Sequence, residues 1–166
     1  MGFQVLQLQP AQMIAAIGAQ DLPIDSVAGL PLHPLVVHAA VVLVPLAAAG
    51  LLAMTIWPRF SRRFSPLILV IAGLGVLAAF AAMLSGEQLA DEIGMRNQQH
   101  FEFGEQVPWV ALAQFVFAGG LAWWDRQRSQ RGVFGIILAI VCALVAIGAV
   151  VGSILAGHSG AELVWG

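Results

Sequence analysis

Four long apolar runs constrain the fold of this 166-residue chain more than any short motif does. Each run holds about the 20 apolar residues that an α-helix needs to cross a bilayer core roughly 30 Å thick. Hydrophobic residues make up 60% of the chain and charged residues only 10%, whereas a soluble domain carries about 25% charged residues. Since the runs are continuous rather than alternating, they predict helices and not barrel strands. We therefore expect an all-α membrane protein, a four-helix transmembrane bundle with spans at about 35–57, 66–85, 107–124 and 132–157.

Residues 1–30 form a separate N-terminal segment ahead of the predicted transmembrane domain, which covers residues 31–166. The middle of this segment, with Asp21 and Asp25, is too polar to span a membrane. Its start also lacks the basic residues of a cleavable signal peptide. We expect a short interfacial helix at residues 11–18, and the alternative is a disordered tail.

The arginines predict the orientation of the chain in the membrane. The short loop WPRFSRRFSP holds three of the seven basic residues and the short loop WWDRQRSQRG holds three more. Basic residues in short loops favour the cytoplasmic side. The remaining loop, between the second and third spans, holds five acids and one arginine. We expect it to be extracytoplasmic, together with both termini.

All four histidines fall on the predicted extracytoplasmic face: His33, His38, His100 and His158. An ionisable ring inside a membrane is costly unless it faces protein, a partner or a cofactor, which makes His38 the strongest candidate ligand. His33 and His38 are about 140° apart on one helix, but Pro34 at a first helical position would leave His33 outside the helix. The alternatives are a hydrogen-bonded imidazole for His38, surface histidines for His33 and His100, and a helix-end role for His158.

Two carboxylates close to the spans are candidates to orient these imidazoles or to carry protons, namely Glu87 and Glu162. The other acids of this face are more simply a solvated loop. The single Cys142 has no partner for a disulfide. The stretch GAVVG, with Gly148 and Gly152, predicts close packing between helices. No catalytic triad, phosphate-binding loop or nucleic-acid-binding cluster is present in the sequence.

Two stretches then indicate a family. GLPLHPLVVHAAVVLVPLA and the closing GHSGAELVWG are similar to the first and last motifs of the uncharacterised bacterial membrane proteins called domain of unknown function 2231. The resemblance covers about residues 29–166, and His100 matches the family's loop histidine in position. One departure is that typical members have a GGELV motif followed by a further histidine, a ligand that this sequence lacks. The resemblance implies an association with redox proteins, since some members are fused to or occur together with Rieske iron-sulfur proteins and cytochromes c.

Three functional hypotheses follow. The first is a b-type haem or other metal centre bound by His33, His38, His100 and His158, which relays electrons between quinol and a respiratory partner such as a Rieske protein or cytochrome. The second is a copper or zinc site built from the same imidazoles. The third is an accessory or assembly subunit of a larger membrane complex, in which the histidines only make hydrogen bonds. An electron-transfer or accessory protein is favoured over a stand-alone enzyme, and the haem preference rests on analogy with the family.

Overall fold

The computed structural model describes residues 26–27, 30–93 and 98–165, which form four long helices after a short pair of strands. The helices are α2 (Leu32–Ile56), α3 (Pro58–Ile93), α4 (Gln98–Gln127) and α5 (Gly132–Trp165). The strands β1 (Ser26–Val27) and β2 (Leu30–Pro31) pair in antiparallel fashion before α2. All four helices are long and apolar enough to cross a membrane. The predicted four-helix transmembrane bundle is confirmed, whereas the interfacial helix predicted at residues 11–18 lies outside the described residues.

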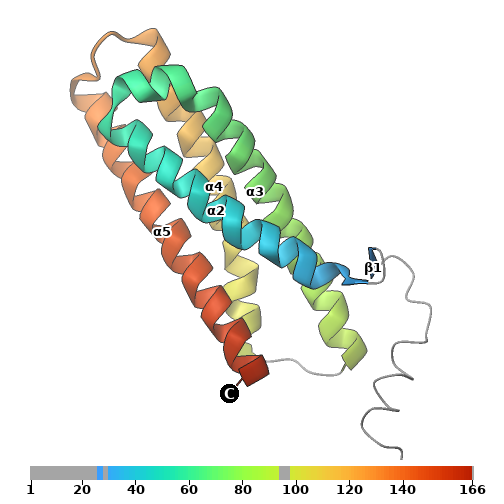
Figure 1. Cartoon of the computed structure of the whole chain (residues 1–166). Helices are drawn as coiled ribbons and strands as arrows, with labels where there is room; N and C mark the ends of the chain where they lie inside the picture. The colour runs from blue at the N-terminus through green and yellow to red at the C-terminus, as the bar shows by residue number, and fades with distance from the viewer. Residues whose placement is uncertain (1–25, 28–29, 94–97, 166) are drawn as a thin grey trace, which may run out of the picture.

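The helices run up and down as a closed bundle (Figure 1). α2 packs on α3, α3 on α4, α4 on α5, and α5 returns to α2. The turns α2–α3 and α4–α5 lie together at one end, which we call the arginine end (residues 54–66 and 124–135). The start of α2 and the end of α5 lie at the opposite end, which we call the histidine end (residues 32–40, 82–93, 98–105 and 155–165). The six arginines that the structure describes thus lie at the opposite end from the histidines, as the sequence predicts, while the direction of the bundle in the membrane stays a prediction.

Three of the four described helices, α3, α4 and α5, extend well beyond the predicted spans. α3 has 36 residues and is therefore about 54 Å long, nearly twice the thickness of a bilayer core. Most of the predicted outer loop is helical, because α3 continues to Ile93 and α4 begins at Gln98. The first predicted loop is helical too, since only Trp57 separates α2 from α3. Pro58 begins α3, a position where its missing N–H costs nothing, so the loop arginines lie in the first turns of a helix instead.

The core is built mainly from small side chains. Leu51, Met54 and Leu121 are the largest apolar residues that are fully buried, and most of the other core residues are alanines. Large apolar side chains point outward instead, for example Leu77 and Phe134. This arrangement suits a helix bundle surrounded by lipid, in which small residues let the backbones approach closely.

The glycines divide into packed and unpacked positions. A Cβ at Gly75 of α3 would lie 3.4 Å from Val44 Cγ2 and 3.5 Å from the backbone of α2, so this glycine marks a close helix contact. Gly148 and Gly152 of α5 have no atom within 4 Å of such a Cβ. The packing role predicted for GAVVG is therefore wrong within one chain, because these two glycines line an open groove.

One amide lies in the core of the bundle midway along α4. Gln114 is 1% exposed, and its Nε2 donates a hydrogen bond of 3.3 Å to the carbonyl oxygen of Val44 on α2. Such a bond ties two helices together where no water competes for the donor.

Candidate functional site: the histidine end and the arginine end

His33 lies between α2 and α3. Its half-buried ring places Nδ1 3.1 Å from the carbonyl oxygen of Ala82 and 3.0 Å from Oγ of Ser85. A carbonyl oxygen only accepts, so the bond to Ala82 requires the hydrogen to be on Nδ1. Gly86 lies next to the ring, and a Cβ there would come within 2.9 Å of His33 Cε1. His33 therefore joins two helices at the histidine end.

His38 lies on the outer surface of α2. Its exposed ring donates from Nδ1 to the carbonyl oxygen of Pro34, one turn earlier, at 2.6 Å. This bond fixes the ring and leaves Nε2 of the neutral tautomer without a hydrogen, the nitrogen that binds metals. Because α2 begins at Leu32, the whole stretch HPLVVH is helical. The prediction that Pro34 would leave His33 outside the helix is therefore wrong. The two rings consequently face different directions, one toward α3 and one outward.

His158 forms an exposed pair near the end of α5. Its Nε2 lies 3.3 Å from Oε1 of Glu162, one turn later, and the two side chains are 71% and 62% exposed. The structure thus places the predicted carboxylate Glu162 beside a predicted histidine. Glu87 lies half-buried on α3. The backbone of His100 lies in the first turn of α4, but its side chain is outside the described residues.

The three histidines whose side chains the structure describes do not form one multidentate group. Among the side chains it describes, no three of histidine, cysteine, aspartate or glutamate lie together as a metal-binding set would require. Each described histidine instead makes its own contact, to α3, to Pro34 or to Glu162. His38 and His158, which are both exposed, are therefore separate candidate ligands of this end.

A buried ion pair at the arginine end was not expected from the sequence. Arg131 donates from Nε and Nη2 to the two carboxylate oxygens of Asp125, at 2.8 and 2.7 Å. Asp125 is only 1% exposed and the arginine side chain 10%. Such a planar, bidentate pair is the strongest geometry for opposite charges.

The same guanidinium caps helix α2. Nη2 donates to the carbonyl oxygen of Met54 at 2.5 Å, and Nη1 donates to that of Thr55. Pro58 stands four residues after Met54 and has no N–H, so this carbonyl has no donor from its own helix. Arg131 therefore joins the ends of α2 and α4 to the start of α5. We call this set, Asp125 and Arg131 with the carbonyls of Met54 and Thr55, the arginine clamp.

The turn that presents Arg131 depends on two glycines. Gly132 adopts a φ of +54°, a left-handed conformation that favours glycine. A Cβ at Gly135 would come within 2.5 Å of Trp124 Nε1 and 2.8 Å of Arg131 Cβ. The only advance signal in the sequence was a single acid, Asp125, beside the three arginines of WWDRQRSQRG. It did not reveal which arginine is buried.

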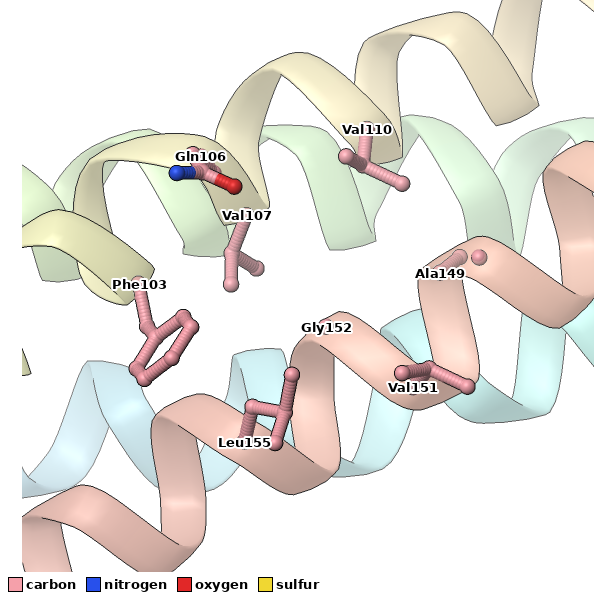
Figure 2. A pocket seen from close by; sticks show the side chains of 9 residues that line it. Phe103, Gln106, Val107, Val110, Ala149, Val151, Gly152 and Leu155 are labelled. Carbon is pink, nitrogen blue, oxygen red and sulfur yellow. The ribbon is translucent and has the colours of Figure 1, made fainter.

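A shallow groove of about 200 Å³ lies between α4 and α5, toward the histidine end. Figure 2 shows the α4 side chains facing the small residues of α5 across it. Its lining is apolar apart from one amide: Phe103, Gln106, Val107, Val110, Gly148, Ala149, Val151, Gly152 and Leu155. None of these lining residues is ionisable, so the groove provides apolar contact and no acid, base or charged ligand.

Comparison with known proteins agrees with the membrane architecture. A family model described as "Predicted membrane protein (DUF2231)" matches residues 29–166. No curated protein and no solved structure matches the chain.

Proposed function

Because the chain belongs to the DUF2231 family of predicted membrane proteins, we propose that it is a membrane electron-transfer protein that binds a haem or metal ion through His38. The observation that carries the proposal is the bond of 2.6 Å from His38 Nδ1 to the carbonyl oxygen of Pro34. Metal-binding histidines usually donate their second nitrogen in this way, which orients the ring and raises the basicity of the first. An exposed imidazole on a membrane-spanning helix also calls for a partner.

In this proposal the chain holds the group at its surface, and a second ligand comes from a partner chain or a second copy. Haem and copper supply one-electron chemistry when bound. His38 provides the ligand atom Nε2, and the Pro34 carbonyl holds the ring in place. His158, with Glu162 as its hydrogen-bond partner, is the candidate second histidine, and His33 and His100 are less direct candidates. We infer quinol as the electron donor and a Rieske protein or cytochrome as the acceptor, because some family members are fused to or occur together with such redox proteins.

The proposed location is the cytoplasmic membrane of a bacterium, with the histidine end on the extracytoplasmic side. What supports it is the gathering of six of the seven basic residues at the other end of the bundle. Positively charged ends of membrane proteins face the cytoplasm.

A second candidate is an accessory or assembly subunit that carries no cofactor. One observation favours it: every described histidine already makes a hydrogen bond or ion pair within the chain. His33 in particular joins α2 to α3, which is a sufficient structural reason for its presence.

One experiment separates these candidates. The full chain is made in a haem-replete host and purified in detergent, and absorption spectra are recorded before and after reduction by dithionite, with metal analysis of the same sample. His38→Ala and His158→Ala are measured beside Gln106→Ala, a control at an exposed polar residue on the same half of the bundle.

A Soret band that His38→Ala abolishes and Gln106→Ala keeps supports a haem. Stoichiometric copper or zinc without a Soret band, lost in the same variant, supports the metal-ion form of the proposal. A colourless, metal-free protein overturns the proposal and favours the accessory subunit.

A further inference from the structure

The arginine end contains a second, larger groove. It has a volume of about 750 Å³ and is lined by both turns of that end. The side chains that matter are Trp57, Arg59, Arg62 and Arg63 from the α2–α3 turn, with Ser129 and Arg131 from the α4–α5 turn. The arginine clamp holds these two turns together, so the groove has walls of fixed spacing.

The charge of this groove is unbalanced. Arg59, Arg62 and Arg63 are exposed, and no carboxylate lines the groove. The nearest acid, Asp125, is already paired with Arg131. Arg62 reaches only the backbone carbonyl of Asp125, at 3.5 Å, and Arg63 stacks on Phe64 with its guanidinium carbon 5.4 Å from the ring centre. Three positive charges therefore stand together without a counterion from the described part of the chain.

The helix dipoles add to this positive field. α3 begins at Pro58 and α5 at Gly132, and neither has an acidic residue in its first turn. Helix N-termini carry a partial positive charge and are stabilised by anions. Arginines in the first two turns of α3 increase the positive charge instead of neutralising it. Binding of an anion at this site is therefore electrostatically favourable.

The surroundings of the groove are those of a membrane interface. Trp57 is 60% exposed at the junction of two membrane-spanning helices. Phe60 and Phe64 stack beside the arginines, with ring centres 4.9 Å apart. Aromatic and basic side chains together at a helix end are typical of the region where lipid headgroups lie.

We propose that this groove binds the phosphate headgroup of an anionic phospholipid, with Arg59, Arg62 and Arg63 as its ligands. The arginines contact the phosphodiester, and Trp57 contacts the glycerol and upper acyl region. The inference is independent of the histidine end and of any cofactor there.

The test measures which lipid the full chain retains. The protein is reconstituted into nanodiscs of equal parts phosphatidylcholine and phosphatidylglycerol, and the lipid that stays bound is identified by native mass spectrometry. We expect phosphatidylglycerol to be retained in preference to phosphatidylcholine. The triple variant Arg59→Gln/Arg62→Gln/Arg63→Gln is expected to weaken this binding about a hundredfold, since each arginine near an anionic surface contributes about a factor of five.

The matched control is Arg126→Gln/Arg128→Gln, which removes two exposed arginines of the same end that do not line the groove. It should weaken the preference by much less than the triple variant does, because neither of these side chains lines the groove. Circular dichroism and gel filtration show whether each variant is folded. If the triple variant is not, the single variants Arg59→Gln and Arg63→Gln are measured in its place.

Three outcomes overturn the proposal. One is equal retention of the two lipids by the unaltered protein. Another is an equal loss in the control and the triple variant, which would make the effect one of total charge. The third is displacement of the bound lipid by inorganic phosphate added in detergent, which would identify the natural occupant as a free phosphate.

Discussion

The two ends of the bundle hold their polar side chains in opposite ways. At the arginine end one guanidinium contacts a carboxylate and two backbone carbonyls, and it joins three helices through groups that are almost fully buried. Among the histidine side chains that the structure describes, His38 and His158 each pair with a residue of their own helix, and His33 bonds to a neighbouring helix. The arginine end is therefore fixed within one chain, while the histidine end leaves two imidazole rings exposed at its surface. A scaffold that is rigid at one end and open at the other suits a protein that binds something at the open end.

Breaking the ion pair should have the largest effect. Asp125→Ala leaves Arg131 buried without its counter-charge, and such a loss costs about 3–5 kcal/mol. We expect a marked fall in the thermal unfolding temperature in detergent. The exposed Arg128→Ala is the control and should change stability by less than about 0.5 kcal/mol.

A double variant sharpens this prediction. Asp125→Ala/Arg131→Met removes both charges, so it should be more stable than Asp125→Ala alone. Equal destabilisation of the two proteins would mean that Arg131 acts through the carbonyls of α2 and not through the carboxylate.

Replacing one glycine by alanine at each end of the bundle tests which end is packed more tightly. Gly135→Ala should destabilise the protein by about 1–3 kcal/mol, because its Cβ meets Trp124 and Arg131 inside the clamp. A Cβ at Gly86 would lie 2.9 Å from the half-buried ring of His33, a less severe contact than the 2.5 Å at Gly135, so the cost of Gly86→Ala should be smaller. Gly120→Ala, which meets nothing within 4 Å, is the control and should be neutral or stabilising. Unfolding temperatures in one detergent rank the three, and the comparison fails if Gly86→Ala is the most harmful.

Removing the interhelical histidine should have a moderate effect. His33→Ala loses the bonds from α2 to Ala82 and Ser85, worth about 1 kcal/mol for a hydrogen bond between membrane helices. Unfolding in detergent measures it. An unchanged stability would show that the hydrogen bonds of His33 do not stabilise the bundle.

Removing the exposed histidine should affect stability least. His38→Ala loses one bond to its own helix at an exposed position, so the apo protein should change by less than about 0.5 kcal/mol. The contrast with His33→Ala is the point of the measurement. Greater destabilisation by His38→Ala in the apo protein would contradict its assignment as a surface ligand.

The sequence predicted the fold well because membrane helices are encoded by simple hydropathy. The four spans and the opposite placement of arginines and histidines follow from apolar runs and loop charge alone. The helix ends were less predictable, since Glu and Gln after Ser85 continue a helix as readily as they form a loop. The clamp could not be predicted, because the contact between Arg131 and Met54 depends on how α2 and α5 pack across 77 residues of chain. The glycines of GAVVG were misassigned for the same reason.

The clamp also has a consequence for how the chain is made. Met54 and Thr55 leave the ribosome some 76 residues before the arginine that binds their carbonyls. Until α5 begins to enter the membrane, the end of α2 has no internal donor for these groups, and water or the insertion machinery has to satisfy them. The closing of the clamp is therefore a late event in the insertion of these four helices, and it marks the moment when α5 has packed against α2.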